Sequence, residues 1–275
     1  MTLSTIRNNP AKQKKVKTKK QKAIAATCAV AFWLLVWHVV SLCVGSELVL
    51  VSPVKVVQTL FTVIFDPDFL KTVWYSAARI LGGFFIALTL GTVLGWVASR
   101  FWVVETLLRP ITAVIKATPV ASFIILVLLW FSGKNLSVII SMLMVFPVIY
   151  MNVLEGIRSA DEKLLEMAQV FRLSVSKKLL YIYLPAVAPF FVSACSVSLG
   201  LCWKSGIAAE VIGTPDGSIG AVFYQAKIFL QTSELLAWTV VVVAVSVAFE
   251  KLFMLLLRLV LKKLKMEDVL NGKRA

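Results

Sequence analysis

Three charged residues within long apolar stretches have the side chains best suited to chemistry. Lys116 lies in the stretch VIKATPVAS, and Lys204 and Glu210 lie in LCWKSGIAAE. A charge in the hydrocarbon of a bilayer is costly, so such residues usually face a partner, a water-filled path or a transported solute. We therefore interpret both lysines as candidates for contact with an anionic solute, and Pro119, Trp203 and Glu210 as parts of the same path.

The local sequence sets expectations for these residues. Pro119 should kink the helix that carries Lys116, because proline has no amide hydrogen to donate. Lys204 and Glu210 are six residues apart, which is about 240° around a regular helix, so they share a face only if the helix breaks at Gly206. The alternative for both lysines is a side chain that snorkels to the membrane surface or pairs with another helix.

Metal and nucleotide chemistry have no recognisable motif in this chain. Its four cysteines (Cys28, Cys43, Cys195 and Cys202) lie in apolar segments without a CxxC pair or a zinc spacing, and His38 is the only histidine. The phosphate-binding pattern G-x-x-x-x-G-K-[ST] does not occur. We predict no metal site, no catalytic residue and no cofactor bound by this chain.

Composition identifies the elements that must position the lysines. Of the 275 residues, 59% are hydrophobic and 16% are charged, and the mean hydropathy is +0.88. Soluble domains have about 45–50% apolar and about 25% charged residues, so we predict an all-α polytopic membrane protein. Backbone polar groups in lipid must bond within their own segment, which makes each span a helix. The six predicted spans are 23–44, 73–98, 104–131, 136–156, 186–209 and 235–260.

The basic residues indicate the orientation of the chain and argue against a nucleic-acid partner. The net charge is +15, but the basic residues lie at the ends of apolar spans, and eight of the 29 fall in the first 22 residues. This placement suits anionic lipid headgroups and puts both termini in the cytoplasm. We predict a basic tail at 1–22, a transmembrane domain at 23–262 with its core at 73–260, and a second tail at 263–275.

Two segments are expected on the outer side. Residues 45–72 should include a short amphipathic helix that starts at Pro53 and stops at Asp66-Pro67. Residues 210–229 are glycine-rich and then amphipathic, which indicates either a re-entrant or gating loop or a plain turn between two spans.

The longest predicted cytoplasmic loop, residues 157–185, has the pattern of two short helices joined by a bend. The first should begin at a capping box that starts at Ser159, and the second at Ser174, before Pro185 opens the next span. An apolar face outside the bilayer must be covered by the rest of the protein or by another protein, so we interpret the loop as a docking element. The apolar face of the first helix is Leu164, Leu165, Ala168 and Phe171.

This loop resembles that of a known family. Glu166-Met167-Ala168, followed by Leu184-Pro185, is similar to the EAA loop of ABC-importer permeases. The resemblance covers about residues 50–260 and points to the nitrate, sulfonate and taurine branch. It rests further on the stretches LVSPVKVV, RILGGFFIALTLGTVLGWVAS, LLRPITAVIKATPVASFIILVLLWF, and AEVIG followed by GSIG.

The resemblance implies a type I ABC importer permease fold in the inner membrane and a set of partners. These are a second permease copy, two ATPase subunits that bind ATP and magnesium, and an extracytoplasmic substrate-binding protein. The solute would be small and anionic, such as a sulfonate, taurine or nitrate. The residues that the resemblance assigns to ATPase coupling are Glu166, Met167, Ala168, Phe171, Arg172, Leu184 and Pro185.

The loop departs from the family pattern at two positions. Met167 replaces an alanine, and Arg172 stands where a glycine is expected. If that glycine provides a left-handed bend, a residue with a side chain costs about 1–2 kcal/mol there. Either the bend is made differently in this chain, or Arg172 has acquired a contact with the ATPase.

Other functions remain as alternatives at this point. The same importer architecture could carry a vitamin or pyrimidine precursor. A secondary transporter would need internal repeats and paired broken helices, and no convincing repeat is found. A non-transporting membrane scaffold would leave the intramembrane lysines unexplained.

Overall fold

The computed structural model describes residues 19–264, and every regular element in this range is a helix. The chain divides into two compact units, residues 1–55 and 56–275. In the first unit, α1 (Lys19–Val44) is apolar and long enough to cross a membrane, as predicted for 23–44. The predicted tail 1–22 lies mostly outside the described residues, and so does nearly all of 263–275.

The second unit is built on three helices, α3 (Phe69–Arg100), α6 (Gly133–Arg158) and α9 (Leu184–Gly213), which pack along their lengths. Close packing depends on small residues, which α3 provides at Gly91 and Gly95. A Cβ atom at Gly91 would lie 2.9 Å from Cβ of Ile149, and one at Gly95 would lie 3.0 Å from Cβ of Val153. The remaining long helix of this unit is α11 (Thr232–Lys263).

The predicted third span, 104–131, is not one continuous helix. It consists of α4 (Trp102–Ala117) and α5 (Val120–Trp130), which are bent by 109° at Thr118-Pro119. The expected effect of Pro119 is therefore confirmed, but it is a break and not a mild kink. By length and composition the described residues contain five helices that could cross a membrane, or six if this bent pair counts as one.

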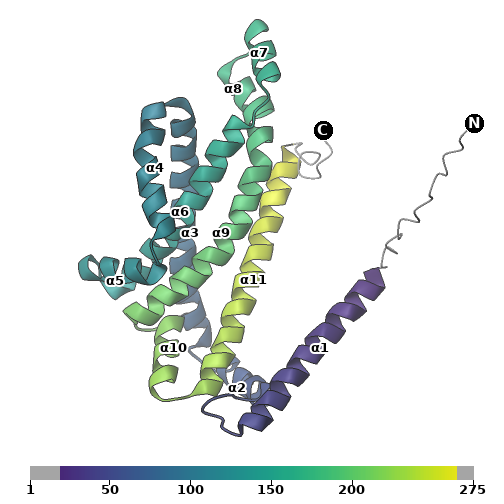
Figure 1. Ribbon diagram of the computed structural model, residues 1–275, viewed down its shortest axis with the longest axis vertical. Coiled ribbons are helices and arrows are strands. Elements are labelled where there is room, and N and C mark those ends of the chain that lie inside the picture. Colours follow the sequence, from purple (N-terminus) through teal and green to yellow (C-terminus); the bar gives the residue numbers. More distant parts are fainter. Residues whose placement is uncertain (1–18, 265–275) are drawn as a thin grey trace, which may run out of the picture. The chain divides into compact units, whose positions relative to one another are not determined.

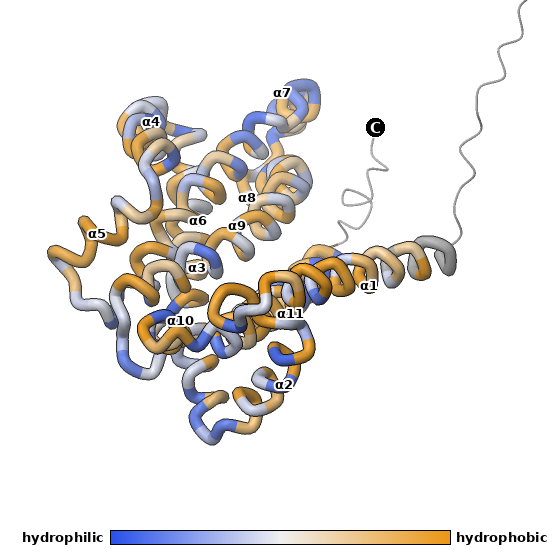
Figure 2. The backbone as a smooth tube through the Cα atoms, turned by 60° about the horizontal axis from the view of Figure 1, so that its bottom comes forward, coloured by the Kyte–Doolittle hydropathy of each residue, from blue (hydrophilic) through white to orange (hydrophobic). Residues whose placement is uncertain are grey.

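The short helices lie at opposite ends of the second unit. In Figure 1, α7 (Glu162–Val170) is at the end where α3 and α11 finish, and α10 (Ile219–Ile228) is at the end where they begin. Figure 2 shows α7 as a helix in which hydrophilic and hydrophobic residues are mixed. The α7 end is the one that the basic residues assign to the cytoplasm. The predicted outer helix is also present, as α2 (Pro53–Ile64).

The loop at 157–185 differs from the prediction in three respects. Ser159 does not cap α7: it ends α6, where its hydroxyl donates to the carbonyl of Gly156, and the side chain of Asp161 accepts from the amide of Lys163 instead. The non-helical part is shorter than predicted, because α6 runs to Arg158. The second helix is not separate either, since α8 (Val175–Lys178) continues through a π turn (Leu179–Tyr183) into α9 as one helix, 175–213.

The π turn has a local cause. Pro185 has no amide hydrogen for a carbonyl one turn earlier, so the regular ladder cannot pass through it unchanged. The amide of Leu184 reaches back to the carbonyl of Leu179 instead. The extra residue in this turn lets the helix continue past the proline.

Candidate functional site

The bend after α7 is left-handed and has Arg172 at its centre. Arg172 has φ +49°, the region that favours glycine. Its amide donates to the carbonyl of Gln169 at 3.0 Å, and the amide of Leu173 donates to the carbonyl of Ala168 at 2.9 Å. These two bonds are the Schellman pattern of a helix end. The first alternative for Arg172, a bend made differently, is therefore wrong, because Arg172 itself adopts the left-handed conformation expected of the glycine. The second alternative, a contact of Arg172 with the ATPase, stays a prediction.

The hairpin formed by residues 159–183 has an inner and an outer apolar surface. The inner surface centres on Ala168 and Ile182, which pack with partly buried Leu165 and Leu173. The prediction of a single apolar face on α7 is wrong. Leu165 and Ala168 face the inner surface, whereas Leu164 and Phe171 are exposed. The exposed outer surface, called the outer ridge below, consists of Leu164, Met167, Val170, Phe171 and Val175.

The predicted coupling residues fall on both sides of the hairpin. Glu166, Met167, Phe171 and Arg172 are exposed, and Ala168 is fully buried. Leu184 and Pro185 are partly buried in the helix that follows. The exposed members lie on or beside the outer ridge, where another protein could reach them.

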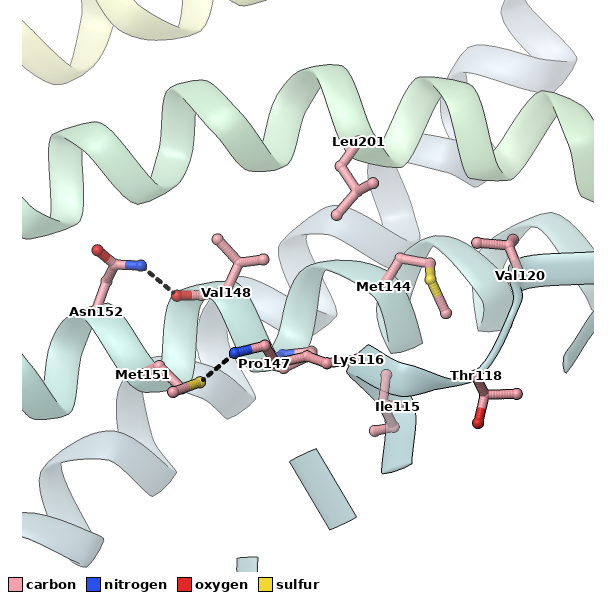
Figure 3. A pocket seen from close by; sticks show the side chains of 10 residues that line it. All are labelled: Ile115, Lys116, Thr118, Val120, Met144, Pro147, Val148, Met151, Asn152 and Leu201. Atoms are coloured by element: carbon pink, nitrogen blue, oxygen red, sulfur yellow. Dashed lines mark hydrogen bonds between the residues drawn. The ribbon is translucent and has the colours of Figure 1, made fainter. Parts of the chain in front are cut away.

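Lys116 lines a hollow between the end of α4, α6 and α9 (Figure 3), with a volume of about 500 Å³. Its Nζ lies 3.5 Å from Sδ of Met151, and the amide of Asn152 donates to the carbonyl of Val148. The sequence analysis missed Asn152, although an amide in the middle of an apolar span was a usable signal. The lining residues are Ile115, Lys116, Thr118, Val120, Met144, Pro147, Val148, Met151, Asn152 and Leu201.

The other predicted pathway residues lie in different surroundings. Lys204 is exposed on α9, three residues after Leu201, and therefore on nearly the same face as this part of the hollow. Trp203 and Glu210 are buried inside the bundle. Within residues 19–264, the ion pairs formed by carboxylates do not include Lys116 or Lys204. The helix is continuous at Gly206, so Lys204 and Glu210 lie on different faces, as the spacing predicted.

Glu210 belongs to a buried network that joins three helices. Its Oε2 accepts from the hydroxyl of Ser76 at 2.6 Å and from the amide of Gly220 at 3.3 Å. The hydroxyl of Ser76 also accepts from the amide of Ile219 at 2.9 Å. A carboxylate at the first turn of α10 complements the positive end of the helix dipole. Ser76 and Glu210 are far apart in the sequence, so no spacing pattern could have paired them.

A second polar cluster lies at the predicted cytoplasmic ends of α4 and α6. Glu105 in the first turn of α4 pairs with Arg158, the last residue of α6, at 2.5 Å, and with Arg109 at 3.7 Å. The Glu105 side chain is only 13% exposed, although its partners are more open. A hollow of about 170 Å³ beside the pair is lined by Glu105, Arg109, Thr112, Tyr150, Met151, Leu154, Glu155 and Arg158.

Comparison with known proteins identifies what this arrangement belongs to. The family model for the inner membrane component of binding-protein-dependent transport systems matches residues 87–266, which include the hollow, the hairpin and Glu210. The chain belongs to this family. It is therefore a non-catalytic, multi-pass permease subunit of an ABC importer in the inner membrane, and it works with ATPase and binding-protein partners.

Curated relatives match the permease over most of its length. It is 34% identical to the putative aliphatic sulfonates transport permease protein SsuC of Escherichia coli (strain K12), over 78% of this chain and 82% of that protein. It is 27% identical to the taurine transport system permease protein TauC of the same strain, over 78% of this chain and 80% of that protein. It is 26% identical to the nitrate import permease protein NrtB of Synechocystis sp., over 74% of this chain and 76% of that protein.

A solved structure supports the fold. The crystal structure of an amino acid ABC transporter with histidines superposes with a TM-score of 0.50 at 16% identity. The superposition covers 70% of this chain and 96% of the other chain. At this identity the likeness concerns the fold alone, which agrees with an ABC importer permease.

Proposed function

We propose that this permease carries a small anionic solute across the inner membrane and is driven through the hairpin 159–183. The observation that supports this most directly is the outer ridge, because it places apolar side chains on a polar helix beyond the spans. Val170 is 79% exposed and Phe171 is 72% exposed. An exposed apolar patch next to polar residues is typical of a protein interaction site.

The proposed occupant of the outer ridge is the partner ATPase. The permease has no phosphate-binding loop of its own, so ATP and magnesium would be bound by that partner. The hairpin is also anchored on its inner side by Ala168 and Ile182, and its bend is fixed by two backbone hydrogen bonds. A force applied to the ridge is thereby passed to α6 and α9, the helices on either side of the hairpin.

The anionic character of the solute is supported by the two lysines. Lys116 faces a hollow with mostly apolar walls, and Lys204 lies on nearly the same face of α9 as Leu201, which lines it. A cation without a carboxylate partner in a low-dielectric region favours an anion nearby. The relatives named for sulfonates, taurine and nitrate agree with this class. The exact solute would depend largely on the binding protein.

The proposed assembly contains a second copy of the permease and two ATPase subunits. In this assembly the exposed face of α9 that carries Lys204 would line a path shared by the two copies. Trp203 and Glu210, whose side chains are buried, would support that path from behind, and Pro119 would set the direction of α5.

Co-purification tests the coupling part of this proposal. The full-length permease, extracted in mild detergent, should retain a soluble ATPase, and Val170→Asp should release it because a charge would be placed on the outer ridge. Lys71→Asp is the control, because it places an aspartate at an exposed position near the start of α3, at the opposite end of the second unit from α7. A stable, transport-active permease without any ATPase would overturn the proposal.

Solute uptake tests the lysines separately. Lys204→Ala and Lys116→Ala should each abolish uptake of the solute that the binding protein retains, without loss of the protein from the membrane. Lys116→Arg keeps the charge and should preserve part of the uptake. Full transport by Lys204→Ala would show that this lysine is not part of the path.

A further inference from the structure

A third hollow lies in the groove between α9 and α11, two helices that pack against each other (Figure 1). Its volume is about 440 Å³, and it shares no lining residue with the hollows beside Lys116 and Glu105. Neither the proposed solute path nor the hairpin uses it. The residues that line it are Ser196 of α9 and Glu250, Lys251, Met254, Leu255 and Arg258 of α11.

The charged groups in this hollow are unevenly satisfied. Oε1 of Glu250 accepts from the hydroxyl of Ser196 at 2.9 Å, which turns the carboxylate toward α9. Lys251 and Arg258 are exposed, and the ion pairs within residues 19–264 include neither of them. Because two cations and one carboxylate line the hollow, it has a net positive charge that a single phosphodiester would neutralise.

The two cations lie on either side of the boundary between hydrocarbon and headgroups. The apolar part of α11 begins at Leu235, after Glu234, and ~20 helical residues cross a hydrocarbon core of ~30 Å. Counted from Leu235, this core ends at about Leu255. Lys251 then lies about one turn inside the hydrocarbon, and Arg258 lies about one turn beyond it on the predicted cytoplasmic side. A phosphate group at the boundary would lie between the two side chains.

Lys251 and Arg258 belong to one exposed stripe on α11, called the α11 stripe below. Its members recur at intervals of three and four residues, so they share one face of the helix. The members nearer the outer end are aliphatic, and the basic ones are nearer the cytoplasmic end. A phospholipid has the same order, with acyl chains in the hydrocarbon and a phosphate at the surface. The members are Val240, Ala244, Val247, Lys251, Leu255 and Arg258, all of them exposed.

A protein segment would suit the α11 stripe less well than a lipid. The helix α1 has no acidic residue, so it offers no carboxylate to Lys251 or Arg258. A second copy of the permease that packed through the same stripe would have the same orientation in the membrane. A two-fold axis would then place like cations at the same depth, where they repel each other.

We propose that the α11 stripe and its hollow bind an anionic phospholipid of the cytoplasmic leaflet. Arg258 donates to the phosphate from the headgroup side, because a guanidinium can bind two phosphate oxygens through parallel hydrogen bonds. Lys251 reaches the same phosphate from the hydrocarbon side with its long side chain. The acyl chains lie along the aliphatic members of the stripe. This site is independent of the proposed solute path and of the ATPase.

Native mass spectrometry of the full-length permease tests this site without ATPase or solute. The permease is purified in mild detergent, and phosphatidylglycerol or zwitterionic phosphatidylethanolamine is titrated into separate samples. Phosphatidylglycerol should bind more tightly. Lys251→Gln and Arg258→Gln should each lower its affinity about fivefold, which corresponds to ~1 kcal/mol for a basic residue near a membrane surface. Arg258→Lys keeps the charge and should retain most of the affinity.

Lys263→Gln is the matched control and should leave the affinity unchanged. Lys263 is exposed at the same end of α11, but it lies about 140° around the helix from Arg258. Equal affinities for the two lipids would overturn the proposal, as would an equal loss in Lys263→Gln or no loss in both Lys251→Gln and Arg258→Gln. Glycerol 3-phosphate has the phosphate without acyl chains. If it displaced phosphatidylglycerol at an equal concentration, the assignment of the site to a lipid would be wrong.

Discussion

The turns that flank the helix 175–213 use the same backbone conformation in opposite surroundings. Before the helix, Arg172 has φ +49°, and after it, Thr214 has φ +41°, so neither turn uses glycine at its left-handed position. The first turn leaves the side chains of Val170 and Phe171 exposed on the surface. The second is next to Glu210, whose side chain is fully buried and bonded to Ser76 and Gly220.

The difference indicates two separate roles. The Glu210 turn is completed by groups of its own chain, so its substitution should affect folding. The Arg172 turn leaves its outer ridge uncovered, so substitution there should affect binding and leave the fold intact. Four predictions test this contrast, in order of decreasing effect.

Gly220→Val should cause the largest loss. A Cβ atom at this position would overlap Cβ and the backbone of Glu210, which cannot move away easily. We expect a destabilisation of about 3 kcal/mol or more, seen as little folded protein in the membrane fraction. Gly82→Val is the matched control, because a Cβ there meets nothing within 4 Å. Equal amounts of both variants would contradict the prediction.

Glu210→Ala should have the next largest effect. It removes the acceptor of two hydrogen bonds and leaves the amide of Gly220 unpaired in a buried site, at a cost of about 2 kcal/mol. The measurement is the temperature at which detergent-solubilised permease loses its monodisperse chromatographic peak. Glu210→Gln retains the volume and one acceptor and should lose less. If Glu210→Ala and Glu210→Gln unfold at the same temperature, loss of the hydrogen bonds is not the cause of the destabilisation.

Phe171→Ala should weaken ATPase binding without changing stability. Removal of an exposed aromatic anchor from an interface costs about 1–2 kcal/mol, or roughly tenfold in affinity. Binding of the purified ATPase to the permease in nanodiscs would measure this. Phe65→Ala is the control, because Phe65 is 80% exposed but lies just after α2, on the predicted outer side. A loss of thermal stability in Phe171→Ala would contradict the assigned role.

Arg172→Gly should have the smallest effect, and a favourable one. Glycine adopts the left-handed conformation without strain, so the permease should gain about 1 kcal/mol in stability. Thr214→Gly should give a gain of the same sign at the other turn. Thermal unfolding measures the stability of both variants. A titration of Arg172→Gly with the ATPase then shows whether the arginine side chain also contributes to ATPase binding. A fall in affinity would assign the guanidinium to the interface.

The sequence was sufficient to predict the spans and a kink at Pro119, because these depend on local hydropathy and on a missing amide hydrogen. It also identified the hairpin and the unusual position of Arg172. It did not predict that 104–131 is divided into two helices bent by 109°. The choice of Asp161 over Ser159 as the cap of α7 was not predictable, since both residue types cap helices well and α6 happens to extend to Arg158. The direction of α5 depends on tertiary packing.

The polar clusters were beyond local patterns. Ser76 and Glu210, like Glu105 and Arg158, come from different helices and are distant in the sequence. Only the packing of α3 against α9 and of α4 against α6 places them together. Periodicity did correctly separate Lys204 from Glu210, because both lie on one regular helix. It also misjudged the face of α7, where a short hairpin buries one side of the helix and exposes the other.

The continuous helix 175–213 has a mechanical consequence. At 1.5 Å per residue its 39 residues extend about 58 Å, well beyond the ~30 Å hydrocarbon core of a bilayer. A rod of this length that tilts about its middle moves its two ends in opposite directions. One end carries Val175 beside the hairpin, and the other carries Glu210 and the turn into α10. The helix can therefore act as a two-armed lever, in which a small push on the inner side of the membrane swings the outer turn the opposite way.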